Sequence, residues 1–318
     1  MSEPGWHEPM LATLTQRPFS AGSWMFERKL DGVRAICSRA NGRPRLWSRN
    51  HRIIDQSYPE IVEALADLGG PEFTADGEIV AFDGARTSFA KLQQRIHLTD
   101  PRRIAATGVR VYYYLFDLLS FGGTDATSLP LRQRKKLLLQ AFDWEDPLRY
   151  SGHRNDDGVA FFTRACEQGW EGVIAKRADA PYRSGRSTDW LKFKCAKDQE
   201  FVVGGFTPPG GSRIGFGALL LGYYEDGRLR YAGKVGTGYN EATLRKLTAR
   251  LTATQRPRSP FADPVPERHA QWVEPELVVR VTFSDWTSDG RLRHPRFTGV
   301  REDKAATEVT RELPSTVE

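Results

Sequence analysis

The sequence predicts an α+β fold in two domains, residues 1–196 and 197–318. Its length of 318 residues exceeds what a single domain usually holds. The first domain mixes alternating, strand-like stretches with stretches whose apolar residues recur at helical spacing, which is typical of sheets with flanking helices. From Glu200 onward, short strand patterns, glycines and turns dominate, and they favour a small β-barrel. A hydrophobic share of 39% supplies enough apolar side chains for two cores.

In the first domain we expect antiparallel sheets with helices beside them. An alternating strand pattern runs through residues 24–37, and a second one, at 45–50, ends in a turn. The helix predicted at 58–68 ends at Gly69-Gly70, a typical helix stop. Further strands are predicted at 72–82, 109–119, 172–176 and 190–194, and further helices at 89–96, 131–142 and 159–168.

The second domain is expected to be a five-stranded barrel of the OB type, because short strands at close spacing are interrupted by one helix. The proline-rich stretch 256–266 indicates a loop. The strands are predicted at 201–206, 218–224, 229–235 and 277–283, and the helix at 241–251.

The net charge of +6 and the pI of about 9.2 suit a polyanionic partner, since lysines and arginines that displace counterions from phosphates drive nucleic-acid binding. The basic residues 132–136 of one predicted helix are interpreted as a solvated face. No apolar run approaches membrane-spanning length, and residues 1–9 have no signal pattern, so we expect a cytoplasmic protein.

The three cysteines, Cys37, Cys166 and Cys195, are scattered and odd in number, and they lack the spacing of metal ligands. This pattern predicts reduced thiols rather than a disulfide framework or a zinc site.

Lys29 is the residue that the sequence marks most clearly for chemistry. It lies in the run Glu27-Arg28-Lys29-Leu30-Asp31-Gly32-Val33-Arg34. A lysine amine is a good nucleophile only when it is neutral, and a buried, cation-rich site favours the neutral form. In such a site Lys29 would form a covalent enzyme–substrate adduct. The alternative is a solvated lysine beside a tight Asp-Gly turn.

Six polar clusters lie on or beside the predicted strands of the first domain. Each one alone has an ordinary structural interpretation, such as a turn, a core aromatic or an exposed strand face. Their order and residue types make the set informative. The clusters are Lys29/Asp31/Arg34, Ser48-Arg49-Asn50, Asp76-Gly77-Glu78, Phe116-Asp117, Glu171-Gly172 with Lys176, and Lys192 with Lys194.

This ordered set resembles the covalent nucleotidyltransferases, which comprise ATP-dependent DNA ligases, RNA ligases and mRNA capping enzymes. A seventh match, Arg301-Glu302-Asp303-Lys304, is similar to the last motif of that family. The resemblance runs from about Pro9 to Arg311 and is strongest to the ligase domain of the bacterial DNA ligase D group, which serves double-strand-break end joining. The stretches that match this group are 89–95, 171–176, 182–186 with 190–194, 293–297 and 301–304.

The resemblance implies a nucleotidyltransferase (adenylation) domain followed by an OB-fold barrel. It also implies an ATP-dependent DNA ligase that seals nicks and breaks, in DNA repair by non-homologous end joining. Lys29 would attack the α-phosphate of ATP and release pyrophosphate, AMP would pass to the 5′-phosphate of a nick, and the 3′-hydroxyl would displace AMP. In-line positioning and electrostatic stabilisation would supply most of the acceleration.

The resemblance also implies residue roles. Catalytic residues would be Lys29, Asp31, Lys192 and Lys194. Nucleotide contacts are implied for Glu27 at the adenine edge, Phe116 stacked on adenine, Arg34 and Glu78 at the ribose, Arg49 at the ribose or the nick phosphate, and for Lys176, Lys192, Lys194, Arg301 and Lys304. Glu171, together with Glu78, would bind Mg²⁺ or Mn²⁺ as a hard oxygen ligand.

Three alternatives remain open: an mRNA capping guanylyltransferase, an RNA ligase, and a non-catalytic OB-fold protein with a vestigial first domain. The run 171–176 and the tail 301–304 favour a ligase over a capping enzyme, and the barrel-like C-terminal half favours a DNA ligase over an RNA ligase. The complete catalytic set argues against a vestigial domain.

The partners implied are nicked or broken double-stranded DNA, the Ku protein of bacterial end joining, and end-joining polymerase and phosphoesterase proteins. We expect no membrane association, a monomer, and a nucleoid-associated protein in a bacterium. The resemblance leaves open whether the chain is a stand-alone ligase, a subunit of a split system or an excised domain.

Overall fold

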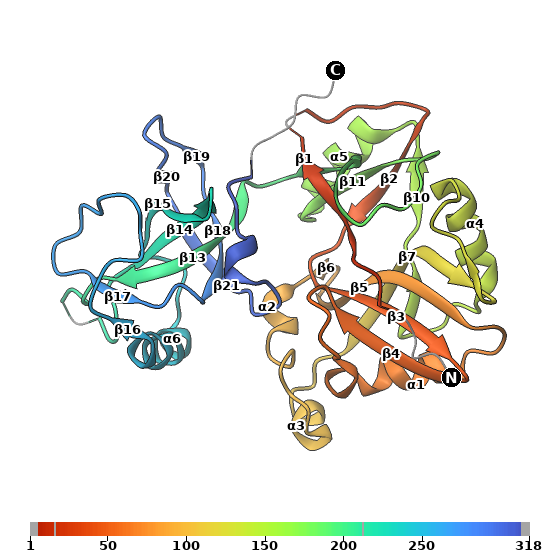
Figure 1. Ribbon diagram of the computed structural model, residues 1–318, viewed down its shortest axis with the longest axis horizontal. Coiled ribbons are helices and arrows are strands. Elements are labelled where there is room, and N and C mark those ends of the chain that lie inside the picture. The colour runs from red at the N-terminus through yellow and green to blue at the C-terminus, as the bar shows by residue number, and fades with distance from the viewer. Residues whose placement is uncertain (1–5, 16, 212, 313–318) are drawn as a thin grey trace. The chain divides into compact units, whose positions relative to one another are not determined.

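The computed structural model describes residues 6–15, 17–211 and 213–312 (Figure 1). The chain divides into two compact units, one that runs to Cys195 and one that begins at Ala196. Each unit has a hydrophobic core of its own. The roles that we predict for residues 1–196, an adenylation domain, and for residues 197–318, an OB-fold domain, remain predictions.

The first sheet of the first unit has the strand order β1-β12-β11-β2-β10. β1 runs parallel to β12, and the other neighbours are antiparallel. Phe26, Val173 and Phe193 from this sheet pack with Ala165 of the helix α5 (Gly158–Glu167). The strands are β1 (Met10–Leu14), β2 (Trp24–Lys29), β10 (His153–Asn155), β11 (Gly172–Arg177) and β12 (Gly185–Lys194).

The second sheet of this unit has the order β4-β3-β5-β7-β8, with β6 paired to β5 and β9 to β7. Its core includes Ile61 and Leu65 from α1 (Pro59–Asp67) and Leu138 from α4 (Leu131–Ala141). The strands are β3 (Val33–Ala40), β4 (Arg43–Ser48), β5 (Phe73–Asp83), β6 (Arg86–Thr87), β7 (Val111–Phe121), β8 (Thr124–Asp125) and β9 (Leu148–Tyr150).

The single strand pattern predicted over residues 24–37 is two strands in two different sheets. β2 ends at Lys29 and β3 begins at Val33, so the three residues between them carry the chain from one sheet to the other. Gly32 allows the crossing, because a Cβ there would collide with the backbone carbonyl of Ile79 on β5. Lys29 therefore lies where the two sheets meet.

The helices agree with the sequence pattern except at 89–106. The helix expected at 89–96 is only α2 (Phe89–Leu92), because Arg95 turns into the core and pairs with Glu60 at 2.6 Å. A helix that we did not predict, α3 (Pro101–Ala106), begins where the side chain of Asp100 accepts from the amide of Arg102. A short 3₁₀ turn (Asp55–Ser57) precedes α1. Among the described residues, every helix is too short or too polar to cross a membrane.

The second unit is a curled antiparallel sheet with one α-helix among its described residues, α6 (Glu241–Ala253), and a 3₁₀ turn (Ala306–Glu308). Its core draws on the strands predicted from the sequence, for example Val203, Leu220 and Val279. The strands are β13 (Asp198–Phe206), β14 (Leu219–Glu225), β15 (Arg228–Val235), β16 (Gln255–Arg256), β17 (Gln271–Val273), β18 (Val278–Thr282) and β21 (Arg296–Val300), with a separate hairpin of β19 (Asp285–Trp286) and β20 (Leu292–Arg293).

The prediction of three reduced thiols is wrong for two of them. Cys166 and Cys195 form a disulfide with their Cα atoms 5.2 Å apart, whereas Cys37 is buried and free. The bridged cysteines are 29 residues apart in the sequence. They meet because α5 packs against β11, and β11 pairs with β12, whose last residue immediately precedes Cys195. Sequence spacing alone could not reveal this adjacency.

Candidate active site

Lys29 forms an ion pair with Glu171, with 2.7 Å between Nζ and Oε1. Both side chains are largely buried, at 18% and 12% exposure. The pair follows from strand register: β2 and β11 are antiparallel, and Lys29 lies directly opposite Gly172, the residue after Glu171. The amide of Cys195 donates to the Glu171 carbonyl, which ties the start of β11 to the end of β12. The sequence motif therefore places its lysine beside a fixed carboxylate.

The same register gathers distant motifs on one face of the first sheet. Residues directly opposite each other in antiparallel strands point to the same face, and every second residue along a strand shares it. Three rows cross β2, β11 and β12 in this way: Lys29 with Gly172 and Lys194, Glu27 with Ile174 and Lys192, and Met25 with Lys176 and Trp190. The predicted lysines 192 and 194 therefore share a sheet face with Lys29.

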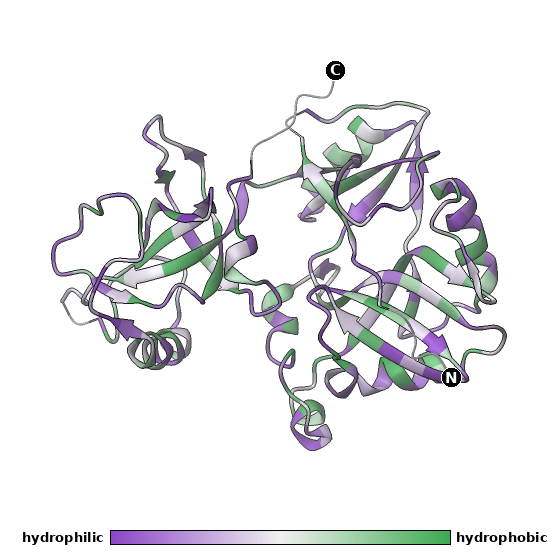
Figure 2. Ribbon diagram, viewed as in Figure 1, coloured by the Kyte–Doolittle hydropathy of each residue, from purple (hydrophilic) through white to green (hydrophobic). Residues whose placement is uncertain are grey.

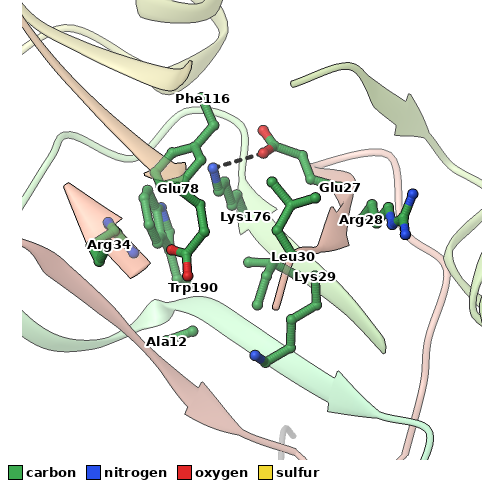
Figure 3. A pocket seen from close by; sticks show the side chains of 11 residues that line it. Ala12, Glu27, Arg28, Lys29, Leu30, Arg34, Glu78, Phe116, Lys176 and Trp190 are labelled. Carbon is green, nitrogen blue, oxygen red and sulfur yellow. Dashed lines mark hydrogen bonds and ion pairs between the residues drawn. The ribbon is translucent and has the colours of Figure 1, made fainter. Parts of the chain in front are cut away.

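A pocket of about 110 Å³ opens at this face (Figure 3). Six predicted site residues line it. Other lining residues were not predicted from the sequence. Two of these, Ile174 and Trp190, lie in the rows that cross β2, β11 and β12. Its lining residues are Ala12, Glu27, Arg28, Lys29, Leu30, Arg34, Glu78, Phe116, Ile174, Lys176 and Trp190.

The Lys176 ammonium lies between two aromatic rings, 4.2 Å from the ring centroids of both Phe116 and Trp190. The guanidinium of Arg34 lies 4.6 Å from the Phe116 centroid. Figure 3 shows Phe116 and Trp190 near Arg34 and Glu78, with the Lys29 side chain extending away from Glu27. Cations over aromatic faces are held by the ring quadrupole, so both rings help to fix these cations.

Arg34 is held by the fully buried carboxylate of Asp76, through contacts of 2.5 Å and 2.6 Å. Tyr182 donates its phenol proton to Asp76 at 2.6 Å, and the amide of Met10 donates to the Tyr182 oxygen. Burial opposes the charge on Arg34, but Asp76 outweighs it and raises the pKa of the guanidinium. Glu78 lies directly opposite Arg34 on the next strand.

Glu27 is buried between two lysines. Its Oε1 lies 2.9 Å from Lys135 Nζ, and its Oε2 lies 2.9 Å from Lys176 Nζ. Burial raises the pKa of the Glu27 carboxyl, but the two ammonium groups lower it by more, so the net shift is downward. Burial lowers the pKa of Lys176 to about 8, although Glu27 opposes that shift.

The interpretation of residues 132–136 as a solvated face is wrong for part of the helix. Arg134 and Lys135 are buried on α4 together with Leu131 and Leu138. Figure 2 shows that hydrophilic and hydrophobic residues are mixed along this helix. Arg134 pairs with the buried Asp117, and Lys135 reaches Glu27. The signal was in the sequence, because positions 131, 134, 135 and 138 have the spacing of one helix face.

Other predicted residues lie outside the pocket lining. The amide of Asp31 contacts the Thr87 hydroxyl at 3.3 Å, and its carboxylate accepts from the amide of Phe89 at the start of α2. Arg49 lies in the turn after β4, which a bond from the His51 amide to the Ser48 carbonyl closes.

Two predicted residues belong to the second unit. Arg301 pairs with Asp303, at 2.9 Å and 2.7 Å, just after β21. Lys304 pairs with Glu200 of β13 at 3.0 Å. Both cations are therefore held within the second unit by its own carboxylates.

Comparisons with known proteins agree with this geometry. The family model "ATP dependent DNA ligase domain" matches residues 9–194, and "ATP dependent DNA ligase C terminal region" matches residues 212–304. The multifunctional non-homologous end joining protein LigD of Pseudomonas aeruginosa is 41% identical over 322 residues, which cover 98% of this chain and 37% of that protein. The LigD of Mycobacterium bovis is 37% identical over 314 residues, covering 96% and 40%. The chain thus spans about two fifths of the length of these curated relatives.

Solved structures agree as well. A mycobacterial DNA ligase D complexed with ATP and MES matches with a TM-score of 0.67 and 35% identity, over 96% of this chain and 98% of that one. The ligase domain from M. tuberculosis LigD matches with a TM-score of 0.51 and 35% identity, over the same shares. These matches confirm the predicted fold class, a nucleotidyltransferase domain followed by an OB-fold domain.

Proposed function

This chain belongs to the ATP-dependent DNA ligases, and from that premise we propose that it joins DNA strands through AMP carried on Lys29, in double-strand-break repair by non-homologous end joining. One observation carries the proposal: Lys29 lines the same pocket as an aromatic ring, a buried carboxylate and a cation–carboxylate pair suited to a sugar. These are Phe116, Glu27, Arg34 and Glu78.

The position of Lys29 supports the first step. Lys29 would attack the α-phosphate as a neutral amine, with its proton lost to solvent and pyrophosphate as the leaving group. Glu171, 2.7 Å from the Lys29 ammonium group, would hold the divalent cation that accompanies the nucleotide. Lys192 and Lys194, on the same sheet face, would balance the charge that builds on the phosphate.

Glu78 and Glu171 fit a divalent cation that arrives with the nucleotide. The described residues contain no group of three or more histidine, cysteine and acidic side chains, so they hold no ready-made metal cage. Mg²⁺ usually binds through one or two carboxylates plus substrate phosphates and water, which matches this donor set. Mn²⁺ accepts the same oxygen ligands. When bound, the ion would neutralise phosphate charge during transfer.

The remaining contacts are proposed from the geometry of the pocket for the residues that line it, and from the resemblance of their motifs for the others. Phe116 stacks on adenine, Glu27 and Lys176 meet the edge of the base, and Arg34 with Glu78 holds the ribose. Arg49 and Asp31 act at the nick, during transfer and sealing. We also propose that Arg301 and Lys304 bind the ATP phosphates, because of the resemblance of their motif.

The partners and the setting are proposals too. Nicked or broken duplex DNA is the substrate, and the names of the relatives above support a role in non-homologous end joining. Since the chain spans about two fifths of those relatives, we propose that Ku and end-joining polymerase and phosphoesterase activities come from other polypeptides or domains. We further propose that the chain works in the cytoplasm, at the nucleoid.

Covalent labelling tests this function. Purified protein is incubated with ATP or GTP labelled at the α-phosphate, with Mg²⁺ or Mn²⁺, and is then denatured. We expect label from ATP to remain on the wild-type chain and to be absent from Lys29→Ala. Nicked DNA with a 5′-phosphate should then release the label and be sealed. If ATP leaves no covalent label with either metal, the proposal is wrong.

A further inference from the structure

A buried cluster beside the pocket carries one negative and two positive charges. The Glu27, Lys135 and Lys176 side chains are 3%, 1% and 2% exposed, and each lysine lies 2.9 Å from one Glu27 oxygen. A buried ion pair normally balances its charges, because an uncompensated buried charge is costly. The second cation therefore calls for an explanation.

No second anion balances this cluster within the described residues around it. Asp117 is a buried carboxylate that also acts on Lys176, but it is engaged by Arg134, through bonds of 2.7 Å and 2.9 Å. Lys135 also donates to the Ser151 carbonyl at 2.5 Å and lies 4.4 Å from the Tyr150 centroid. These contacts hold the ammonium group but add no negative charge.

His153 also faces the cluster, directly opposite Glu27 on β10. Burial and the charge of Lys135 lower the pKa of this imidazole, so it stays neutral at physiological pH. It therefore does not compensate the excess charge either.

The two lysines lie on different sides of Glu27. Lys176 lines the pocket beside Phe116, as Figure 3 shows, whereas Lys135 belongs to α4 and is not part of the pocket lining. An ionised carboxylate has room for about four hydrogen bonds. Lys176 and the Ser151 hydroxyl use two of them, both on Oε2, at 2.9 Å and 3.3 Å, and the Lys135 ammonium group forms an ion pair at Oε1. Because Glu27 also lines the pocket, its carboxylate keeps acceptor capacity for a donor bound there.

We propose that Lys135 is a positioning residue that selects the nucleobase by holding Glu27 fixed and ionised beside Lys176. This inference rests on the proposed function, in which the pocket holds the base of ATP. Adenine presents an amino donor next to a ring-nitrogen acceptor, which complements a carboxylate beside an ammonium group. Guanine presents a carbonyl oxygen and an N–H in the same places. The carbonyl oxygen would face the carboxylate and the N–H would face the ammonium group, so both contacts would be unfavourable.

Removing Lys135 should loosen this arrangement without removing Glu27 or Lys176. In Lys135→Met the remaining Glu27–Lys176 pair is electrically balanced, so the variant should fold. Glu27 loses the cation that holds its Oε1 and can turn toward Lys176. Lys176 also loses a neighbouring like charge that lowers its pKa, so that pKa should rise from about 8. The groups that remain around Lys176 are Glu27, Asp117 and the neutral His153.

The test measures single-turnover labelling of Lys29 with ATP and with GTP between about pH 6.5 and pH 9.5. It compares wild type, Lys135→Met and Lys136→Met, whose exposed lysine is the next residue on the same helix. For Lys135→Met we expect labelling to persist, with a higher KM for ATP and a smaller change in kcat. The preference for ATP over GTP should fall about tenfold, the scale of one lost base-edge contact. The alkaline limb of the ATP profile should move to higher pH.

Lys136→Met should match wild type in all of these measurements. Lys135→Gln removes the charge but keeps a donor for the Ser151 carbonyl, so it should lose selectivity as Lys135→Met does. If Lys135→Met has a low melting temperature, Lys135→Gln replaces it in the test. A folded Lys135→Met or Lys135→Gln with wild-type base preference and pH profile would overturn the inference. The inference would also be overturned if the preference of the wild-type protein for ATP over GTP did not change as the pH rises through 8. A wild-type protein that takes no label from ATP would instead overturn the proposed function.

Discussion

The phenol of Tyr182 donates a 2.6 Å hydrogen bond to Asp76, the buried carboxylate that holds Arg34 in the pocket wall. Tyr182 thus fixes Arg34 without lining the pocket itself. Tyr182→Phe removes this bond and the acceptor for the Met10 amide. Because hydrogen bonds to charged groups are the stronger kind, we expect a loss of about 2 kcal/mol in the free energy of unfolding. We also expect a several-fold higher KM for ATP, measured by lysyl-AMP formation.

The matched control for this prediction is Tyr239→Phe. The Tyr239 hydroxyl donates to the Val235 carbonyl in the second unit, so its loss also removes one phenol hydrogen bond. It should lower stability but leave the KM for ATP unchanged. Equal KM values for Tyr182→Phe and Tyr239→Phe would contradict a role for Tyr182 in holding Arg34.

Phe116 should contribute to ATP binding through its ring rather than through its volume. Phe116→Leu keeps a buried apolar side chain but loses both the stacking surface and the face over Lys176. Stacking of a base on an aromatic ring is worth about 1–3 kcal/mol, so ATP affinity should fall about 5- to 150-fold. Phe116→Tyr should stay near wild type. Titration of each folded variant with ATP measures this effect, and equal affinities for the two variants would count against stacking.

The buried Lys176 gives a pH dependence of stability with a definite sign. Its folded pKa is about 8, below the ordinary lysine value of 10.5. Between these two values the unfolded chain binds more protons than the folded chain does, so this group makes the free energy of unfolding rise with pH. Lys176→Met should lack that rise. Urea denaturation of both proteins at several values from pH 7.5 to pH 10 measures the difference, and parallel curves would contradict the lowered pKa.

The bridge between Cys166 and Cys195 should stabilise the first unit. It closes a loop over a sequence separation of 29 residues, for which the loss of chain entropy in the unfolded state predicts about 3–4 kcal/mol. A thiol reductant should therefore lower the melting temperature of this unit in a calorimetric scan. The control is the double variant Cys166→Ser with Cys195→Ser, which should melt at the reduced temperature and ignore the reductant. A wild-type scan that is unaffected by complete reduction would refute the expected gain.

Much of the site could be predicted because its residues are local in sequence. Glu27 and Lys29 lie two residues apart on one strand, and Lys192 and Lys194 share a strand face, so their patterns indicate the chemistry before any fold is known. What sequence reasoning missed depends on contacts between distant segments. For example, Ile79 of another strand approaches Gly32 too closely for any Cβ, and the sequence pattern of residues 24–37 does not contain that contact.

Lys135 shows a different kind of failure. Its helical spacing with Leu131 and Leu138 marks a buried face, but a lysine in a basic run is ordinarily exposed, so the composition and the spacing point in opposite directions. The partner that makes its burial tolerable, Glu27, is 108 positions away in the sequence. Cys166 and Cys195 were misjudged for the same reason, since their pairing depends on the packing of α5 beside β11 and β12.

The bridge also changes what a break in the backbone would do. The segment that it closes contains Glu171, Lys176, Lys192 and Lys194, and it includes exposed residues such as Arg183 between β11 and β12. A protease that cuts there opens the chain but does not divide it, because both pieces stay joined through sulfur. On a denaturing gel such a nicked protein would run as one band until a reductant separates it into two. The four side chains would thus remain covalently tethered to one another even after the peptide chain between them is cleaved.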